Sequence, residues 1–243
     1  CSPNGKNINE GCGSLHPEVI SDLVKEHGAD IGIAYDGDAD RVILCDEKGD
    51  VFDGDKILAL CALDFKKRGV LEGGGVVGTV MSNLGLQKAL ADEGLELHRA
   101  AVGDRYVLSM MREKGLNLGG EQSGHLISLS QNTTGDGILS SLLVLSALRN
   151  QDKSLSAFSN IIETCPQVLI NIKVDKKLPF EELPGVQAAL KDADQKLAGK
   201  GRVLLRYSGT EPKARVMVEA ESQNLCDELA GSIANQLQEE LSG

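Results

Sequence analysis

Three aspartates that alternate with small residues, followed directly by an arginine, constrain this chain more than any other feature of its sequence. Residues 36 to 41 read Asp-Gly-Asp-Ala-Asp-Arg and stand between two largely apolar runs, residues 29 to 35 and residues 42 to 45. Short apolar runs joined by a turn that contains glycine are typical of two neighbouring β-strands. The sequence therefore predicts that the three carboxylates lie together on a tight strand-to-strand loop.

The chemistry of this acidic loop favours a divalent cation. Side chains two positions apart in an extended loop can converge, and carboxylate oxygens are ligands for Mg²⁺, Mn²⁺ or Ca²⁺ rather than for zinc. Without a cation the repulsion among three carboxylates would be unfavourable. We therefore predict a metal site formed by Asp36, Asp38 and Asp40, with the guanidinium of Arg41 facing a phosphate group.

Two other interpretations of the acidic loop remain open. In an EF-hand, these acids would take positions 1, 3 and 5, and Glu47 would take position 12. Position 6 is then Arg41, where the EF-hand needs glycine, and the flanking segments resemble strands rather than helices. The loop could also be a solvated acidic turn, since turns favour Asp and Gly.

The composition argues against several classes of protein. The chain has 243 residues, which is enough for one large domain or for two to three small ones. A net charge of −11 argues against a surface that follows a nucleic-acid backbone, and 3% aromatic content without Trp argues against stacking platforms for bases. No apolar segment approaches the length of a membrane span. We expect a partner that is a small molecule held by polar groups, and neither nucleic acid nor a membrane.

The six cysteines are scattered and form no Cys-x-x-Cys pair, so they predict neither a zinc site nor a disulfide framework. Cys45 and Cys61 lie in apolar runs and are expected in the core. This usage is typical of the reducing cytoplasm, where we expect the protein. The chain does not begin with Met, and its first residues do not resemble a signal peptide. We therefore expect it to be a fragment of a longer protein.

Helix and strand patterns alternate along the chain, which predicts an α/β fold. We expect helices at about residues 17–27, 54–67, 84–93, 104–114, 136–149 and 185–197, and strands at about 76–80, 95–100, 126–129, 168–174, 203–207 and 214–220. Leucines and an isoleucine at a spacing of four, from Leu225 to Leu241, predict a final helix that packs on the core. In the strand at 214–220 the alternation predicts that Val216 points inward and that Arg215 and Met217 point outward.

A change in composition near residues 150 to 154 helps to divide the chain into three expected pieces. Residues 1–52 would be the end of one α/β domain, which carries the acidic loop. Residues 53–160 would be a complete α/β domain with a mixed sheet. Residues 161–243 would be a small C-terminal α+β domain.

Four motifs occur in a fixed order along the chain. They are the acidic loop, Gly-Asp-Arg-Tyr-Val at 103–107, Gly-Glu-Gln-Ser-Gly-His at 120–125, and Arg-Tyr-Ser-Gly-Thr-Glu-Pro-Lys-Ala-Arg at 206–215. Together they resemble the α-D-phosphohexomutase superfamily over essentially the whole chain. The run at 7–18, the second motif and Gln122 are most similar to the members that act on glucosamine phosphates.

This resemblance implies a fold and an activity. Members have four domains around a central cleft, and a phosphoserine in the first domain exchanges its phosphoryl group with a hexose phosphate. The implied reaction interconverts glucosamine 6-phosphate and glucosamine 1-phosphate through a bisphosphorylated intermediate, with a hexosamine or hexose 1,6-bisphosphate as activator. The acidic triad would hold Mg²⁺, whose remaining ligand is a phosphoserine oxygen, and Arg41 would lie against the same phosphate as a catalytic residue.

The resemblance also implies residues that bind the sugar. Glu121 and Ser123 would contact sugar hydroxyls, Asp104 and Arg105 would belong to the loop that distinguishes sugars, and His125 would assist substrate binding. Each has a plainer interpretation: a capped turn at 120–125, an ordinary charged helix start at Asp104, and a histidine that only satisfies a neighbour.

The 206–215 loop is the best candidate for a phosphate site. Ser208, Gly209 and Thr210 offer two hydroxyls and closely spaced backbone amides, and Gly209 permits the backbone conformation of an anion nest. Arg206 and Arg215 could add charge-assisted contacts. The plainer interpretation is a hairpin loop with incidental arginines.

One feature of the family is missing. The Thr-Ala-Ser-His-Asn-Pro-like loop that carries the phosphoserine does not occur, and Ser2-Pro3-Asn4 lacks the histidine. We therefore expect the N-terminal half of the same protein as a partner, and we expect this chain alone to be inactive. Alternatives are a phosphomannomutase or phosphoglucomutase, a non-catalytic module that binds sugar phosphates, and a calcium-binding structural protein.

Overall fold

The computed structural model describes residues 2–208 and 211–241. The chain divides into two compact units, Cys1–Glu163 and Thr164–Gly243, and each is described here by itself. Helices and strands alternate through the first unit, so the predicted α/β class is confirmed.

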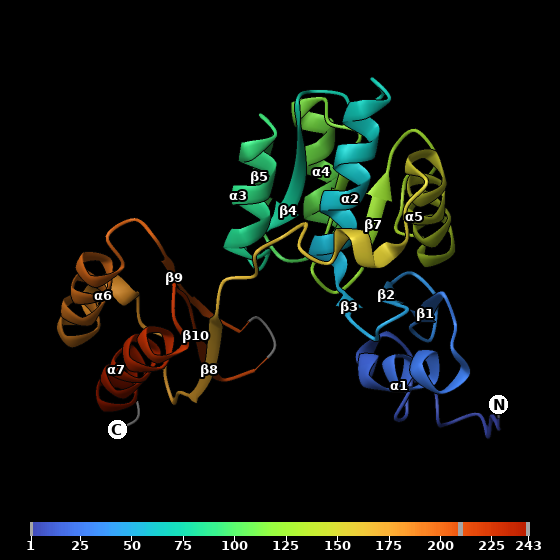
Figure 1. Cartoon of the computed structure of the whole chain (residues 1–243). Helices are drawn as coiled ribbons and strands as arrows, with labels where there is room; N and C mark the ends of the chain where they lie inside the picture. Colours follow the sequence, from blue (N-terminus) through green and yellow to red (C-terminus); the bar gives the residue numbers. More distant parts are fainter. Residues whose placement is uncertain (1, 209–210, 242–243) are drawn as a thin grey trace. The chain divides into compact units, whose positions relative to one another are not determined.

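The N-terminal part of the first unit is a small antiparallel sheet with strand order β1-β2-β3 (Figure 1). Its elements are the 3₁₀ turn Gly13–Leu15, α1 (Pro17–His27), β1 (Ile31–Tyr35), β2 (Val42–Asp46) and β3 (Val51–Phe52). Helix α1 contacts β1 and β2, and it ends at Gly28, whose φ of 59° is left-handed. The acidic loop is thus the connection between β1 and β2. Because strands flank it, the EF-hand interpretation is wrong.

The rest of the first unit is built on a four-stranded mixed sheet with order β5-β4-β6-β7, in which only β7 is antiparallel. Its elements are α2 (Gly54–Lys67), β4 (Gly75–Thr79), α3 (Leu84–Asp92), β5 (Glu96–Ala100), α4 (Asp104–Lys114), β6 (Leu118–Gly120), β7 (Leu126–Ser128), α5 (Gly137–Gln151) and the 3₁₀ turn Leu155–Phe158.

Successive side chains along the strands point to opposite faces of this sheet, and each face packs in its own apolar cluster. Val76 belongs to the apolar cluster that contains α2, α3 and α5, whereas Val77 belongs to the cluster that contains α4. Cys45 and Cys61 are 0% and 1% exposed, as their apolar context predicted, and Cys61 belongs to the first of these clusters. The loops that follow β4, β5 and β6 meet at one edge, because the carboxyl ends of parallel strands lie together.

The second unit is an antiparallel sheet with order β8-β10-β9, packed against two helices (Figure 1). Its elements are β8 (Gln167–Lys173), the 3₁₀ turn Phe180–Glu182, α6 (Pro184–Leu197), β9 (Arg202–Tyr207), β10 (Lys213–Glu219) and α7 (Gln223–Leu241). The predicted stripe of α7 is confirmed, since Leu229, Ile233 and Leu237 are at most 1% exposed.

Met217 points away from the helices, as the alternation predicted, but its side chain is buried rather than exposed to solvent. Its side chain is 1% exposed, although Val216 and Val218 occupy the face that packs on the helices. Strand β10 is central, and the register places Leu169 of β8 and Leu204 of β9 beside Met217 on the other face. Apolar neighbours on both flanking strands therefore remove it from water.

No helix within residues 2–208 and 211–241 combines the length and the apolar composition that a membrane span requires.

Asp55 is a buried carboxyl in the first turn of α2, and its side chain links this helix to the loop after β4. It is 2% exposed, and its Oδ2 accepts a hydrogen bond from the Asn83 amide at 2.7 Å. Burial raises the pKa of Asp55 to about 7; the charge of Asp53 acts in the same direction, and the hydrogen bond from Asn83 opposes it.

We predict that Asp55→Asn changes how stability depends on pH. The folded-state pKa near 7 exceeds the ordinary value of 3.8, so the folded state binds this proton more tightly. The contribution of protonated Asp55 to stability is therefore present below about pH 4 and is lost as the pH rises to about 7. Relative to wild type, the variant should gain stability over this range, by on the order of 4 kcal/mol at most.

Urea unfolding at a series of pH values measures this difference, and Asp22→Asn on the exposed side of α1 is the control. Parallel pH profiles for wild type and Asp55→Asn would contradict the raised pKa.

Candidate metal centre and ligand pocket

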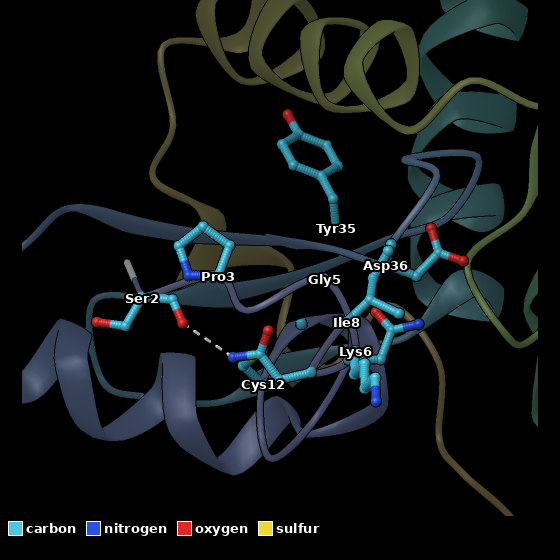
Figure 2. A pocket seen from close by; sticks show the side chains of 12 residues that line it. Ser2, Pro3, Gly5, Lys6, Ile8, Cys12, Tyr35 and Asp36 are labelled. Carbon is cyan, nitrogen blue, oxygen red and sulfur yellow. Dashed lines mark hydrogen bonds between the residues drawn. The ribbon is translucent and has the colours of Figure 1, made fainter.

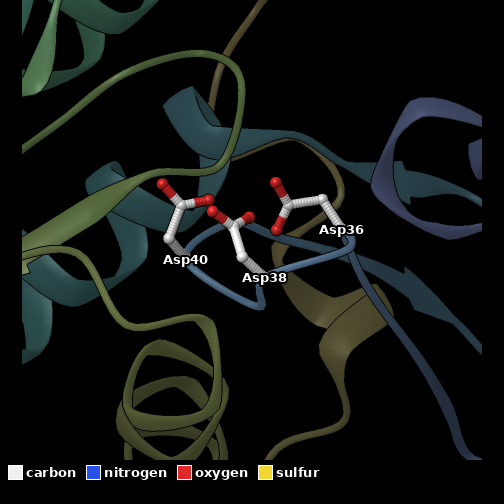
Figure 3. A group of neighbouring side chains, drawn as sticks. All are labelled: Asp36, Asp38 and Asp40. Atoms are coloured by element: carbon white, nitrogen blue, oxygen red, sulfur yellow. The ribbon is translucent and has the colours of Figure 1, made fainter. Parts of the chain in front are cut away.

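The structure brings the three acidic side chains of the β1–β2 loop together (Figure 3). One carboxylate oxygen of each of Asp36, Asp38 and Asp40 can be chosen so that all three lie within 4.8 Å of one another. A cluster of carboxylate oxygens at this spacing fits a hard divalent cation, which would also offset their repulsion.

The conformation of this loop is held by the start of α5. Ala39 has a left-handed φ of 59°, which is uncommon for a residue other than glycine. Its amide donates to the carbonyl of Asp36 at 3.1 Å, and its carbonyl accepts from the amide of Gly137 at 2.9 Å. A Cβ at Gly137 would lie 2.7 Å from the carbonyl oxygen of Arg41. Helix α5 can approach the acidic loop this closely only because Gly137 lacks a side chain.

Arg41 is bound to the first carboxylate of the loop. Its Nε lies 2.8 Å from Asp36 Oδ2, and its amide donates to Asp36 Oδ1 at 3.1 Å. Burial favours a raised pKa for Asp36, but the bonds from Arg41 outweigh it and the pKa is lowered. The pKa of Asp40 is raised, first by burial and then by the neighbouring Asp36. Asp36 is therefore more readily ionised than Asp40.

A cavity of about 310 Å³ opens beside this loop. Its walls come from the acidic loop, from the start of α4 and from the loop after β6, and they comprise Asp40, Arg41, Gly103, Asp104, Glu121, Ser123 and His125. Every side chain in this set is polar or charged. The cavity therefore suits a small polar molecule with several hydrogen-bonding groups, rather than an apolar ligand.

The loops after β5 and β6 are tied together by Glu121. Its Oε1 accepts a hydrogen bond from the Gly103 amide at 3.0 Å, at the start of α4. Its own amide donates to the carbonyl of His125 at 2.9 Å, which closes the 121–125 loop. The carboxylate is thereby fixed next to Asp104 in the cavity wall.

His125 connects the cavity to the acidic loop. It is 5% exposed, and its Nδ1 lies 3.1 Å from Asp40 Oδ2. Its Nε2 is buried and has no hydrogen-bond partner in the part of the chain that the structure describes. A Cβ at Gly135 would lie 2.2 Å from this atom, so the ring packs directly on a glycine backbone. His125 is placed to orient Asp40 as well as to line the cavity.

Two glycines let the 121–125 loop pack on its neighbours. The Val42 amide donates to the Gly124 carbonyl at 3.1 Å, and a Cβ at Gly124 would lie 2.2 Å from the carbonyl oxygen of Val42. On the other side, the Gly54 amide donates to the Gln122 carbonyl at 3.0 Å. Sequence reasoning missed Gly54 as a supporting residue; its position directly after Asp53, the residue that caps α2, is the signal that could have identified it.

Arg105 is the predicted sugar residue that does not line this cavity. Its Nη2 donates to the Tyr106 hydroxyl at 2.5 Å, and its guanidinium carbon lies 4.5 Å from the centre of that ring. The side chain thus lies along the exposed surface of α4, whereas Asp104 faces the cavity.

The predicted phosphate loop lies in the second unit. Arg206 and Arg215 are register partners on β9 and β10, so their side chains are neighbours on one face. Burial lowers the pKa of Arg206, and the charge of Arg215 lowers it further. Ser208 is 3% exposed, and its Oγ accepts from the Glu211 amide at 3.2 Å. Gly209 and Thr210 lie outside the described residues.

A second cavity, of about 610 Å³, has Asp36 in its wall (Figure 2). The N-terminal loop forms most of its wall, with Pro3, Ile8 and Cys12, and Tyr35 and Gly37 complete it. Sequence reasoning did not predict this cavity, because it depends on how the irregular segment folds back onto β1.

Three sequence models of one family match the chain. They are described as Phosphoglucomutase/phosphomannomutase, alpha/beta/alpha domain II, over residues 10–49; alpha/beta/alpha domain III, over residues 53–165; and C-terminal domain, over residues 169–236.

Curated relatives resemble the chain along nearly its whole length. Phosphoglucosamine mutase of Bacillus pumilus (strain SAFR-032) is 51% identical over 240 residues, which is 99% of this chain and 54% of the relative. The phosphoglucosamine mutase of Pelobacter propionicus (strain DSM 2379 / NBRC 103807 / OttBd1) is 55% identical over 218 residues, 90% of this chain and 48% of the relative. The chain thus spans about half the length of the curated relatives it matches.

Solved structures share the fold. Aspergillus fumigatus N-acetylphosphoglucosamine mutase in complex with GlcNAc-6P and magnesium has a TM-score of 0.74 at 23% identity, and the match covers 95% of this chain and 53% of that one. A phosphoglucomutase/phosphomannomutase family protein from Burkholderia thailandensis has a TM-score of 0.71 at 24% identity, and covers 93% and 51%. At these identities the similarity concerns the fold alone.

We predict that Gly54→Ala disturbs the ligand pocket, because the new Cβ would lie 2.0 Å from the Glu121 carbonyl oxygen. The loop or the start of α2 must move, at a cost of about 1–3 kcal/mol in stability. The matched control is Gly231→Ala in α7, where no atom lies within 4 Å of the new Cβ. The control should be more stable by about 0.5–1 kcal/mol, because alanine favours helix over glycine.

Thermal or urea unfolding of both variants measures these changes. Equal effects of the two substitutions would contradict the close contact between α2 and the 121–125 loop.

Proposed function

We propose, from the premise that this chain belongs to the α-D-phosphohexomutase superfamily, that it carries the metal, sugar and distal phosphate sites of a phosphoglucosamine mutase. The reaction of the whole protein would interconvert glucosamine 6-phosphate and glucosamine 1-phosphate. The observation that carries the proposal is the polar cavity in which Arg41, Glu121 and Ser123 meet beside the acidic triad.

Asp36, Asp38 and Asp40 would hold Mg²⁺. Bound there, the ion would supply positive charge to a phosphoryl group during transfer. The carboxylate donor set and the spacing of the oxygens support this assignment. Magnesium is present in the solved structure of the Aspergillus fumigatus enzyme, which shares the fold.

Arg41 would bind the transferring phosphoryl group. Its Nε is anchored on Asp36 at 2.8 Å, so the guanidinium plane is fixed in the cavity wall before a ligand arrives. Fixed cations favour phosphoryl transfer because this reaction requires charge neutralisation and in-line positioning more than covalent participation by the protein.

The sugar would occupy the cavity between the acidic loop and the start of α4. Glu121 and Ser123 would bind ring hydroxyls, since a carboxylate accepts and a serine hydroxyl both donates and accepts. Asp104 and Glu121 also add negative charge, which favours a sugar that carries an ammonium group over one that carries only hydroxyls. Arg105 could reach a ligand only by leaving Tyr106.

The second phosphate of the intermediate would be bound by the loop of the second unit, through Arg206, Ser208 and Arg215, with Gly209 and Thr210 as further contacts implied by the family motif. The intermediate, a hexosamine or hexose 1,6-bisphosphate, would exchange its two phosphates between this loop and the phosphoserine. The phosphoserine would come from the N-terminal half of the same protein, in the cytoplasm. The half-length match to the curated relatives supports this expectation.

Two alternatives rest on specific observations. The family models describe phosphoglucomutase and phosphomannomutase, so glucose or mannose phosphates are candidate substrates. The phosphoserine motif does not occur in this sequence, so a module that only binds sugar phosphates is also a candidate. Turnover of the three sugar phosphates by the full-length parent would separate these possibilities.

We predict that the chain binds Mg²⁺ weakly and that Asp38→Asn weakens this binding at least about tenfold, because one of three carboxylate ligands is lost. Calorimetric titration with MgCl₂ measures the affinity. Asp22→Asn, an exposed change with the same loss of charge, should leave it unaltered. Equal affinities for wild type and Asp38→Asn would rule out the triad as the metal site.

We predict that the purified chain alone does not convert glucosamine 6-phosphate to glucosamine 1-phosphate, even with Mg²⁺ and a hexose bisphosphate. Moving a phosphoryl group without hydrolysis requires a protein group that accepts and returns it, and the motif that would carry this group is absent from the sequence.

A coupled assay for glucosamine 1-phosphate tests this prediction. Addition of a separately made N-terminal half should restore activity. Turnover by the chain alone that is abolished in Asp38→Asn would mean that the nucleophile lies within these residues.

A further inference from the structure

The carboxylate of Glu211 contacts two cations of the candidate phosphate loop. Its Oε1 lies 2.6 Å from Lys213 Nζ, and its Oε2 lies 3.2 Å from Arg215 Nη2. The hydrogen bond from Lys213, followed by the charge of Lys213, lowers the pKa of Glu211. Glu211 is therefore an ionised group that engages the cations to which the proposed function assigns phosphate binding.

These cations belong to a wider positive surface on one face of the second unit. Ala214, Val216 and Val218 point toward α6 and α7, so Lys213 and Arg215 point to the opposite face. In the sheet register, Arg206 lies beside Arg215, and Lys173 lies beside Lys213. Four cationic side chains thus share the helix-free face at this end of the sheet.

Like charges this close together repel and favour a bound anion. The lowered pKa of Arg206, caused by burial and by Arg215, is one sign of this repulsion. A separate observation favours an anion: Arg215 Nε is buried and has no acceptor among residues 2–208 and 211–241. The cluster therefore contains a donor that Glu211 leaves unsatisfied, while Glu211 occupies Nη2 of the same guanidinium.

We propose that Glu211 is an internal competitor for phosphate: its carboxylate binds Lys213 and Arg215 in the ligand-free protein and is displaced when a phosphate group enters. The inference rests on the proposed function of the 206–215 loop, and it adds Lys213 as a phosphate ligand. A phosphate dianion has more charge and more acceptor oxygens than a carboxylate, so it can replace Glu211.

For the reaction, this competition would give the loop only a moderate affinity for phosphate. Phosphate must displace Glu211 on entry, and Glu211 returns to the cations when phosphate leaves. A bisphosphorylated sugar that has to release one phosphate and present the other would turn around faster in such a site than in one that binds phosphate as tightly as the cations allow.

The alternative role for Glu211 is that of a positioning residue, which would hold Arg215 in the orientation that phosphate binding requires. The two roles differ in sign. Removal of an internal competitor strengthens phosphate binding, whereas removal of a positioning contact weakens it.

The test is titration of the 243-residue chain with inorganic phosphate in EDTA at constant ionic strength, followed by the NMR signals of the arginine Nε–H groups. We expect Glu211→Gln to bind phosphate about two- to tenfold more tightly than wild type, the range expected when a partly exposed ion pair no longer competes. Glu181→Gln, in the exposed 3₁₀ turn of the same unit, changes the net charge equally and should leave the affinity unchanged.

The gain in phosphate affinity should disappear in the double variant Glu211→Gln/Arg215→Ala, because this gain depends on the guanidinium that Glu211 no longer occupies. Thermal unfolding verifies that each variant is folded. Unchanged or weaker phosphate binding in Glu211→Gln, with normal binding by wild type, would overturn this inference and leave the phosphate site intact. Absence of binding in both proteins would overturn the phosphate site itself and the inference with it.

Discussion

The candidate site depends on one close backbone contact between segments that are far apart in the sequence. The amide of Val42, at the end of the acidic loop, donates to the carbonyl of Gly124 in the loop after β6. A side chain at Gly124 would collide with Val42, and one at Gly54 would collide with Glu121. Only glycine at these two positions allows the acidic loop, α2 and the 121–125 loop to meet. This contact brings Arg41 and Glu121 into the wall of one cavity.

Two cationic or polar neighbours hold the carboxylates of the acidic loop, one from the loop itself and one from the 121–125 loop. The acidic loop alone would be a repulsive cluster, but Arg41 binds Asp36 and His125 binds Asp40, so two of the three carboxylates are oriented before any cation arrives. Pre-organised ligands lose less entropy when an ion or a phosphate binds. In the second unit the arrangement is the reverse, because cations are concentrated there and the single carboxylate of Glu211 partly neutralises them. Each unit thus presents a charge opposite to that of its proposed ligand, which is Mg²⁺ in the first unit and phosphate in the second.

Local sequence patterns predicted much of this structure, and long-range contacts account for the rest. The helix at Gly54–Lys67 was predicted at its observed bounds, because its cap and its apolar spacing are local signals. Strand β6 was missed, since Leu118-Gly-Gly has little strand propensity and exists through its pairing with β4 and β7. The burial of Met217 and the position of Arg105 on Tyr106 depend on neighbours that no periodicity reveals. The motifs identified most of the residues that line the cavity, but not the glycines that allow its walls to meet.

The most direct test of the central claim, that the contact between the acidic loop and the 121–125 loop creates the sugar-phosphate site, is a crystal structure of this chain with Mg²⁺ and glucosamine 6-phosphate. We expect an ion on Asp36, Asp38 and Asp40, and a sugar in the cavity bounded by Arg41 and Glu121, with its hydroxyls on Glu121 and Ser123. A sugar phosphate bound instead in the cavity of the N-terminal loop beside Ile8, with the cavity at Glu121 occupied by water alone, would contradict this claim.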